Sequence, residues 1–497
     1  MINSLRKQPW YLLLLPLFFV MHGYTENFGF INLGDTLILV FTYVAVAIIL
    51  YFLFLVIFKN RIKAALAESF VMAFYLFFGA IQDFCKVHFA ILNRYSVLLP
   101  LFLILFIALI VYLKKSKSSF WKLNLFLNSL FLIYIIVDLG SLVNKNFNPP
   151  LNKLSSYSFA KNNNYQPCNN CPRPDIYFLL FDEYESSASL KTHFNYDNNS
   201  FDTFLIEQGF HIQRNSRSNY NFTPFSMASI LNMSYLTGIR PGEIYIEDYA
   251  RCNELIRKNE VINFLSVQGY EIVNYSIFDL AGNPSLVSQN ILPLKTKLIT
   301  DATLFNRLQR DLGWMLLSGK FEVKWLSAGI VYTNLHNNEK FLDLLAKSSS
   351  ERSSVPRFFY GHLLMPHPPY YFDKKGNSKQ GDVVYKEWQE LNTEAYLEYV
   401  TYTNTKIKEL ISAIKKNTKG QAVIIFMGDH GFRKATDDND KTHYFENQDA
   451  VYFPSGDYQS FYDSASTVNQ FRIIFNTLFL RNFTILKDST IFLTDKK

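Results

Sequence analysis

Hydrophobic residues dominate the first 143 positions of the chain and become sparser after them. A membrane-spanning helix needs roughly 20 predominantly apolar residues. Five segments approach that length, although the first and third are short and need their amphipathic flanks: Trp10–His22, Thr36–Phe58, Phe70–Gln82, Ser96–Leu113 and Leu123–Val143. The pattern predicts an α-helical transmembrane anchor of about five helices over residues 1–143.

Basic residues cluster before the first segment and in two of the breaks between the segments. The clusters are Arg6 and Lys7, then Lys59, Arg61 and Lys63, then Lys114, Lys115, Lys117 and Lys122. Because Lys and Arg are retained in cytoplasmic loops, the N-terminus is predicted inside and everything after Val143 outside. A cleaved signal peptide fits less well, since no small-residue cleavage site follows the first apolar run. We therefore expect a multi-pass protein of the bacterial inner (cytoplasmic) membrane with an extracytoplasmic, periplasmic domain.

The charge of the chain divides at the same place as its hydropathy. The first 150 residues hold 12 Lys and Arg against 5 Asp and Glu, an excess equal to the net charge of +7 of the whole chain. The remaining residues are therefore electrically neutral as a group. The positive charge is a signal of membrane topology, and it does not indicate binding to nucleic acid.

A segment at 144–173, rich in Asn, Pro, Ser and Tyr, has no sustained periodicity and is predicted to be a linker. It contains Cys168 and Cys171. The two cysteines can form a local disulfide with each other, or one of them can pair with Cys252, or both can stay reduced. The sequence does not distinguish these three alternatives. A zinc site would require two further ligands that the neighbouring sequence does not supply.

Residues 174–497 alternate short apolar strands with helical stretches. The expected strands are Ile176–Phe181, Glu271–Ile277, Arg357–Leu364 and Ala422–Phe426, and a long helix is expected over Leu391–Lys416. This alternation predicts an α/β domain with a mainly parallel central sheet covered by helices on both faces. In such sheets, ligands bind beyond the carboxyl ends of the strands.

Metal-ligating residue types stand at these strand ends. Asp182 and Glu183 follow the first strand, Asp429 and His430 follow the last, and His367 lies in a proline-rich turn after another. Singly, each motif has an ordinary interpretation, as a helix cap, a surface turn or a rigid loop. Together they predict a site for a divalent metal, with zinc, manganese or magnesium as the candidates.

The motifs PDIYFLLFDE and AVIIFMGDHG resemble the first and last metal-binding motifs of the alkaline phosphatase/sulfatase superfamily. About five membrane helices before such a domain is an arrangement similar to phosphoethanolamine transferases and lipoteichoic acid synthases. The resemblance spans roughly residues 174–485. It implies an alkaline phosphatase-like α/β sandwich with one or two divalent metals, held here by Asp182, Glu183, Asp429 and His430, and a nucleophile that becomes transiently esterified.

The resemblance also implies where the nucleophile lies. The matching segment is NYNFTPFSMASILNMSYLTG, and it lacks the C-x-P-S-R or S-x-P-S-R sequence from which true sulfatases make formylglycine. Thr is the nucleophile type of the transferases, so Thr223 is the predicted nucleophile, with Ser226 as the alternative. Pro224 favours a helix start here, so Thr223 has a second interpretation as a helix N-cap.

Two histidines complete the expected site. His367 resembles the histidine of the P-H-P segment that meets substrate or metal in these families, and His443 follows the D-H-G motif at a distance where relatives often carry another histidine. Both are predicted to bind substrate. For His443, an ordinary surface histidine is the competing interpretation.

The resulting hypothesis is a metal-dependent transferase. It would move a phospho-substituent of the phosphoethanolamine or glycerol-phosphate type from a phospholipid donor to an envelope glycan or lipid through a phospho-threonine intermediate. A sulfatase-like hydrolase (phosphodiesterase, phosphatase or unconventional sulfuric ester hydrolase) is the first alternative. A non-catalytic envelope scaffold is the second, and the joint presence of the four motifs argues against it.

Overall fold

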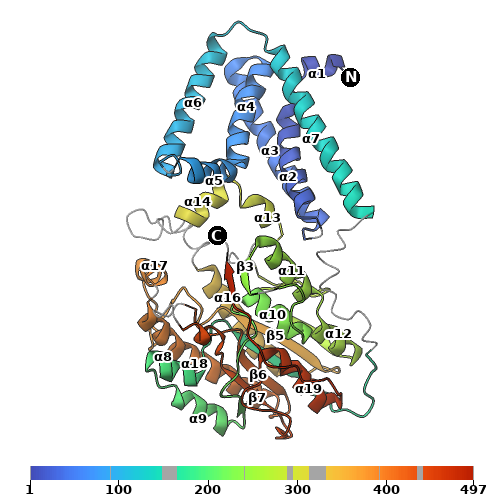
Figure 1. Cartoon of the computed structure of the whole chain (residues 1–497), viewed down its shortest axis with the longest axis vertical. Coiled ribbons are helices and arrows are strands. Elements are labelled where there is room, and N and C mark those ends of the chain that lie inside the picture. The colour runs from blue at the N-terminus through green and yellow to red at the C-terminus, as the bar shows by residue number, and fades with distance from the viewer. Residues whose placement is uncertain are drawn as a thin grey trace. The chain divides into compact units, whose positions relative to one another are not determined.

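The structure is a computed structural model that describes residues 2–28, 30–89, 91–147, 165–239, 241–287, 295–312, 332–390, 392–433 and 440–495. The chain forms two compact units. The helical unit comprises Met1–Leu151 and Pro293–Gly313, and the α/β unit comprises Asn152–Leu292 and Trp314–Lys497. Each unit is treated separately below (Figure 1).

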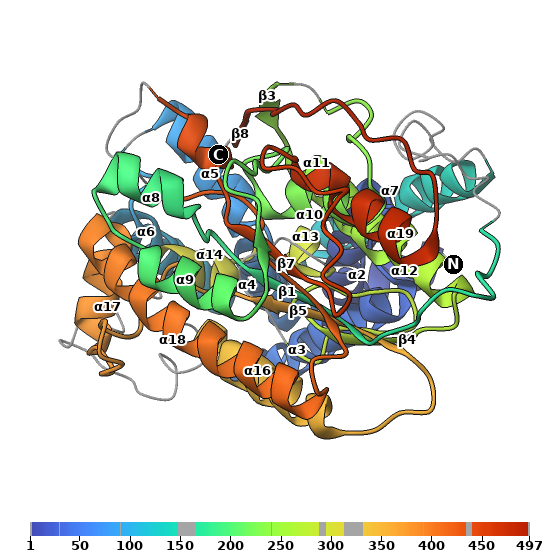
Figure 2. The ribbon, with the colours of Figure 1, turned by 90° about the horizontal axis from the view of Figure 1, so that it is seen from below.

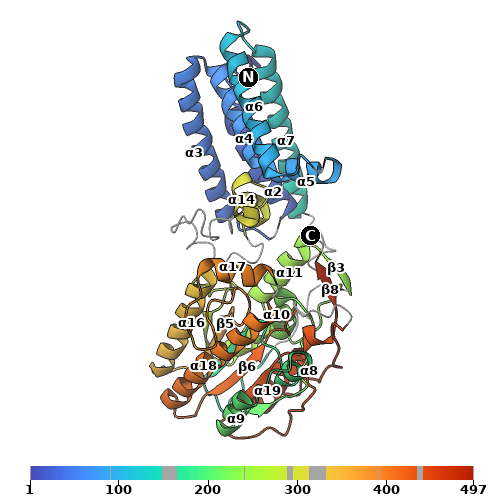
Figure 3. The same cartoon turned by 90° about the vertical axis from the view of Figure 1, so that its left-hand side faces the viewer.

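The longer helices of the helical unit run side by side, whereas α5 (Phe78–His88) lies across them (Figure 3). The helices of this unit are α1 (Ile2–Lys7), α2 (Tyr11–Glu26), α3 (Leu33–Phe58), α4 (Arg61–Leu76), α5, α6 (Tyr95–Lys115), α7 (Trp121–Phe147), α13 (Lys297–Thr300) and α14 (Leu304–Leu312). Within the described residues, α3, α6 and α7 are long and apolar enough to cross a membrane. Helices α4 and α5 make a fourth candidate span if the pair, bent by 63°, counts as one.

The expected number of five spans is therefore not confirmed. The first predicted segment corresponds to α2, which has only 16 residues, and the third straddles the bend between α4 and α5. A run of apolar residues does not reveal a break between two helices, because both sides of the break remain apolar. Three to four apolar helices nonetheless indicate that this unit anchors the protein in a membrane.

Buried polar side chains of α7 bind the N-terminal segment. The amide nitrogen of Asn128 donates to the backbone oxygens of Leu5 and Gln8 at 2.7 and 2.8 Å, and its Oδ1 accepts from the backbone N–H of Tyr11 at 2.7 Å. In an apolar environment such bonds cannot be exchanged for bonds to water. They therefore fix the start of α2 against α7.

Helices α13 and α14 belong to the helical unit, although they come from the middle of the region that the sequence suggests is one domain. Ile299 is buried in a cluster with residues of α2, α3 and α4. The guanidinium of Arg307 makes two hydrogen bonds to the carboxylate of Asp83, at 2.8 and 2.7 Å. The Tyr95 hydroxyl donates to Asp311 at 2.7 Å. These contacts join residues more than 200 positions apart, which is why local sequence patterns gave no sign of them.

The α/β unit is organised around a six-stranded sheet in the order β2-β7-β6-β1-β5-β4. The strands are β1 (Ile176–Phe181), β2 (His211–Ile212), β4 (Glu271–Tyr275), β5 (Arg357–Leu363), β6 (Val423–Gly428) and β7 (Asp449–Tyr452). Strands β4, β5, β1 and β6 are parallel to one another, whereas β7 is antiparallel to β6 and β2 is antiparallel to β7. The sheet is mixed, so the expected mainly parallel sheet is not confirmed as such. The polar segment between β6 and β7 carried no strand signal that would have indicated the reversal.

The strand register decides where polar groups gather. Phe181 at the end of β1 is level with Leu363 of β5 and with Gly428 of β6. Because the three strands are parallel and in step, the residues that follow them emerge at one edge of the sheet. Asp182 and Asp429 are the residues that come next on β1 and β6.

Helices cover both faces of the sheet (Figure 2). They are α8 (Ser187–Phe194), α9 (Asn199–Glu207), α10 (Thr223–Asn232), α11 (Ile246–Arg257), α12 (Glu260–Val267), α16 (Thr333–Ser350), α17 (Gly381–Gln389), α18 (Thr393–Asn417) and α19 (Gln470–Phe479). Alternate residues of β1, such as Tyr177 and Leu179, pack into a core with α16 and α18. Phe178 instead contacts Phe471 of α19. The continuous apolar run of β1 is explained by this burial on both faces.

A smaller sheet pairs β3 (Gly242–Ile244) with β8 (Leu493–Asp495), and short 3-10 helices η3 (Thr442–Phe445) and η4 (Thr467–Asn469) lie beside the main sheet. Cys168 and Cys171 form a disulfide, while Cys85 and Cys252 are buried free thiols. The sequence left the cysteine pairing open, and the structure contains the local Cys168–Cys171 disulfide.

Candidate metal and nucleophile site

The chain turns sharply where β1 and β6 end. Glu183 adopts a left-handed backbone conformation with φ of +60°, which is uncommon for a residue with a side chain. Gly428 must be glycine, because a Cβ there would lie 2.4 Å from the backbone oxygen of Tyr184. These two features bring the turns after both strands into direct contact: the N–H of Glu183, the second residue after β1, donates to Oδ1 of Asp429, the first residue after β6, at 3.0 Å. Backbone strain of this kind is often found at functional sites.

The glycine of the D-H-G motif has a steric role. A Cβ on Gly431 would lie 1.9 Å from the backbone oxygen of His443, so no other residue fits between this turn and η3. The backbone oxygen of Gly431 lies 2.8 Å from Nδ1 of His430. Donation from Nδ1 to that oxygen fixes the ring and directs Nε2 towards Asp429 and Thr223, where it can act as a metal ligand.

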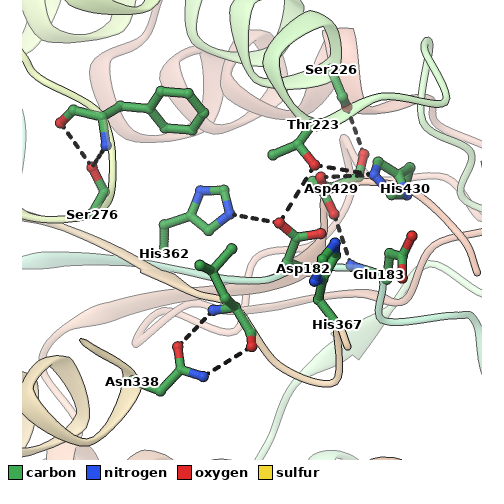
Figure 4. Close-up of polar contacts among 12 residues, drawn as sticks. Asp182, Glu183, Thr223, Ser226, Ser276, Asn338, His362, His367, Asp429 and His430 are labelled. Carbon is green, nitrogen blue, oxygen red and sulfur yellow. Dashed lines mark hydrogen bonds and ion pairs between the residues drawn. The ribbon is translucent and has the colours of Figure 1, made fainter. Parts of the chain in front are cut away.

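Thr223 begins α10 and points at the ends of both strands (Figure 4). Its Oγ1 lies 3.4 Å from Oδ2 of Asp182 and 3.2 Å from Nε2 of His430. The N-cap of α10 is Phe222, and the partners of the Thr223 hydroxyl among the described residues are these two side chains. The hydroxyl thus contacts the predicted metal ligands, and it does not cap the helix.

The alternative nucleophile is differently placed. Ser226 is completely buried, and its hydroxyl donates to the backbone oxygen of Asp429 at 2.6 Å (Figure 4). That bond occupies the only proton of the hydroxyl and positions the turn after β6. Ser226 therefore stabilises the fold at this turn, and its hydroxyl does not face the ligand group.

Asp182, Asp429 and His430 form the one group of metal-ligating side chains found in the described parts of the chain, with ligand atoms all within 4.8 Å of one another. All three residues are buried. Oδ1 of Asp182 and Oδ2 of Asp429 have no hydrogen-bond partner among the described residues. Buried carboxylate oxygens are normally paired, so these orphaned atoms fit a cation. Two carboxylates and one imidazole suit zinc or manganese, and magnesium less well.

The electrostatics of the group also fit a cation. Burial, reinforced by the neighbouring charge of Asp429, raises the pKa of Asp182 to about 7. Oδ2 of Asp429 also lies 3.2 Å from Nε2 of His430, so the ligand atoms converge on one point. A divalent ion there would offset the repulsion between the two carboxylates and restore Asp182 to its ionised form.

Glu183 was expected to share in metal binding, but it does not belong to the ligand group. Its Oε1 accepts a hydrogen bond from Nε of Arg433 at 2.8 Å. Burial alone would raise the pKa of Glu183. The charge of Arg433, the neighbouring His367 and His430, and the hydrogen bond from Arg433 together outweigh this effect and lower the pKa of Glu183 to about 2. Glu183 is therefore an ionised carboxylate paired with a guanidinium, and its role towards metal stays a prediction.

His362 is a site residue that the sequence analysis missed. It lies on β5, completely buried, with Nε2 3.4 Å from Oδ2 of Asp182 and Nδ1 3.1 Å from the Tyr360 hydroxyl. Burial lowers the pKa of His362 to about 4, so the ring is neutral. A neutral ring that accepts from Tyr360 donates from Nε2 to Asp182 and orients that carboxylate. The sequence signal for this residue was a histidine within the mostly apolar strand segment Arg357–Leu363.

The two predicted substrate-binding histidines are separated in the structure. His367 lies next to Asp182 and Glu183 (Figure 4), and its backbone N–H donates to the Asp182 backbone oxygen at 3.1 Å. His443 lies on η3, outside the ligand group, with its ring 5.3 Å from that of His193. Both ring nitrogens of His443 lack a hydrogen-bond partner among the described residues. His443 is buried, so the surface interpretation does not describe it.

Comparison with known proteins gives one family match. Residues 280–471 match the family model described as Sulfatase, a region that contains Asp429, His430, His367 and His443 but neither Asp182 nor Thr223. No curated protein matches the sequence.

Several solved structures resemble the chain at low identity. The C-terminal periplasmic domain of the phosphoethanolamine transferase EptC from Campylobacter jejuni has 14% identity, covering 63% of this chain and 92% of its own, with a TM-score of 0.36. A zinc complex of the corresponding domain of EcEptC from Escherichia coli has 10% identity, with coverages of 63% and 86% and a TM-score of 0.38. The phosphonate monoester hydrolase of Agrobacterium radiobacter has 12% identity, with coverages of 62% and 74% and a TM-score of 0.39.

The family match confirms the resemblance first seen in the strand-end motifs. Residues 280–471 are sulfatase-like, which agrees with the superfamily expected from the motifs and with an enzymatic function.

Proposed function

We propose that this protein is a metal-dependent transferase that moves a phospho-substituent through a covalent intermediate on Thr223. The observation that carries the proposal is the position of Oγ1 of Thr223, within 3.4 Å of Asp182 and 3.2 Å of His430. A hydroxyl held against two potential metal ligands is the arrangement of an activated nucleophile.

Asp182, Asp429 and His430 would hold the divalent metal, which supplies a lowered hydroxyl pKa and positive charge to offset the negative charge of the transition state. His362 keeps the Asp182 carboxylate oriented, and the bond from Ser226 keeps the turn at Asp429 in place. The side chains of the site are buried, so the electrostatic interactions among them are strong.

In the first step, Oγ1 of Thr223 bonds to the phosphorus of the donor while the bond from phosphorus to the donor's ester oxygen breaks. The Thr223 proton passes to a neighbouring base, and the departing alkoxide takes up a proton. In the second step, an acceptor hydroxyl attacks the same phosphorus, the bond to Oγ1 breaks and Thr223 regains its proton. The substituent moved is of the phosphoethanolamine or glycerol-phosphate type.

The helical unit supports the choice of partners. Three to four apolar helices hold the enzyme in a membrane, where a phospholipid donor is available. The proposed acceptor is a hydroxyl of an envelope glycan or lipid on the extracytoplasmic side. The corresponding location is the bacterial inner membrane, with the α/β unit in the periplasm. The sulfatase family match favours a second candidate, a sulfatase-like hydrolase in which water replaces the acceptor.

The test is intact-protein and peptide mass spectrometry of the full-length protein purified from its own cells. A phospho-adduct on the peptide containing Thr223 is expected, and its mass identifies the substituent. If water hydrolyses the adduct as fast as any acceptor hydroxyl removes it, the protein is a hydrolase instead. Complete absence of an adduct on Thr223 after incubation with metal and phospholipid would refute the covalent mechanism.

A further inference from the structure

Arg433 follows the D-H-G motif and lies beside the proposed nucleophile. Its Nε donates to Oε1 of Glu183 at 2.8 Å, and its guanidinium carbon lies 4.9 Å from the centre of the Phe222 ring. Phe222 directly precedes Thr223. The guanidinium is therefore held by an ion pair on one side and by a cation–π contact on the other.

Burial shows which parts of the site meet solvent. Asp182, Asp429 and His430 have at most 2% of their surface exposed, and Thr223 has 8%. The Arg433 side chain is 22% exposed, while its partner Glu183 is 1% exposed. Arg433 is therefore the most exposed of these side chains, while its partner carboxylate is buried.

Among the described residues, Arg433 has one hydrogen-bond partner, Glu183. A guanidinium has five N–H donors, of which Nε uses one for Glu183. Among the described residues, its Nη1 and Nη2 groups make no hydrogen bond. Their planar fork matches two oxygens of a tetrahedral anion such as phosphate or sulfate.

The charges of the site require this residue. Asp182, Glu183 and Asp429 bring three carboxylates together, and one divalent metal offsets only two negative charges. Arg433 forms an ion pair with Glu183 and supplies the third positive charge. With the metal and Arg433 in place, the site is neutral and can accept an anionic ester without repulsion.

We propose that Arg433 binds the transferred oxyanion through its Nη groups, with Glu183 serving to hold the guanidinium in position. This inference rests on the proposed function and adds the recognition of its substrate. The ligand class is a tetrahedral oxyanion ester, in which one oxygen pair contacts Arg433 while the central atom faces Oγ1 of Thr223.

The test measures anion binding to the full-length, detergent-solubilised protein loaded with zinc or manganese. Calorimetric titrations with inorganic phosphate and with inorganic sulfate are made on wild type and on Arg433→Gln, Arg433→Lys and Arg257→Gln. Arg257 is the matched control, because it also pairs with a glutamate, Glu254, in the same unit. We expect Arg433→Gln to weaken binding of the preferred anion at least about tenfold, a typical loss for a charge-assisted pair, with metal content unchanged. Arg433→Lys should recover part of the affinity, and Arg257→Gln should match wild type.

A double variant separates direct binding from simple charge compensation. If Arg433 only neutralises Glu183, then Glu183→Gln combined with Arg433→Gln restores wild-type anion affinity, and the inference is overturned. Continued weak binding by a folded, metal-loaded double variant supports it. Wild-type affinity in Arg433→Gln alone would also overturn it while leaving the proposed function intact. Wild-type protein that takes up neither metal nor anion would instead refute the proposed function. The preferred anion distinguishes a phospho ester from a sulfo ester.

Discussion

Oγ1 of Thr223 and Nε2 of His430 lie 3.2 Å apart, although 207 positions separate the two residues in sequence. One begins a helix and the other follows a strand, and each is at the end of its element that faces the same edge of the sheet. The hydroxyl therefore shares its immediate surroundings with the predicted metal ligands.

Substitution of Thr223 separates catalysis from helix capping. Because the hydroxyl contacts Asp182 and His430, Thr223→Ala should melt within a few degrees of wild type and still bind metal, yet form no adduct. Thr223→Ser keeps a hydroxyl and should retain part of the adduct formation. A helix cap would behave in the opposite way, with alanine costing about 1 kcal/mol of stability and little activity. Thermal melts and adduct mass spectrometry on both variants measure the two effects.

Ser226→Ala provides the comparison at the alternative hydroxyl. The variant should still form the adduct, since the Ser226 hydroxyl donates its proton to the backbone oxygen of Asp429. An adduct that persists in Thr223→Ala and disappears in Ser226→Ala would transfer the nucleophile role to Ser226.

Loss of a proposed metal ligand should empty the site. Asp429→Ala and His430→Ala are expected to weaken metal binding by more than the roughly 10–100-fold that loss of an outer-sphere partner causes. His443→Ala is the control, because His443 lies outside the ligand group, and its effect should be smaller. Elemental analysis of the purified full-length proteins measures the metal. Equal metal content in all three variants and wild type would contradict the assignment of the site.

The orientation in the membrane can be tested with reporters. The basic clusters predict that a reporter fused after Leu113 is cytoplasmic and that one fused after Lys145 is extracytoplasmic. Fusions with alkaline phosphatase and with a fluorescent protein give opposite signals at the two positions. Identical signals from both positions would rule out the predicted orientation, whatever the exact number of spans.

Asp449 should make the stability of the α/β unit depend on pH. It is buried on β7, and burial raises its pKa to about 8, although Ser216 and Gln470 donate hydrogen bonds to its carboxylate. Between pH about 4, the pKa of an aspartate in the unfolded chain, and pH about 8, Asp449 keeps its proton in the folded state and loses it in the unfolded state. Stability from this group is fully present at low pH and falls as pH rises through that window, by up to about 1.4 kcal/mol per pH unit.

The measurement is a set of thermal melts at pH 5 to 8.5. Asp449→Asn cannot ionise, so its melting temperature should vary less with pH than that of wild type. Asp343→Asn, at an exposed position on α16, should keep the wild-type dependence. If Asp449→Asn follows the wild-type curve across the range, the carboxyl is already ionised in the folded protein.

The sequence by itself determined the features that depend on local pattern. The bounds of β1 were predicted correctly because a strand buried on both faces has a continuous apolar run. The positions of β4, β5 and β6 followed within two residues from the same signal. Asp182, Asp429 and His430 were identified because strand ends of an α/β sheet collect ligands, and family resemblance added Thr223. The sulfatase-like class was within reach of these motifs alone.

Tertiary structure decided the features that depend on which distant residues meet. The pairing of Glu183 with Arg433, the contact of His362 with Asp182, the antiparallel edge at β7 and the packing of α13 and α14 with the helical unit all involve such contacts. A side chain's partners through space depend on strand order and register, which local periodicity does not encode. The residue types of the site could therefore be read from the sequence, whereas the division of work among them required the fold.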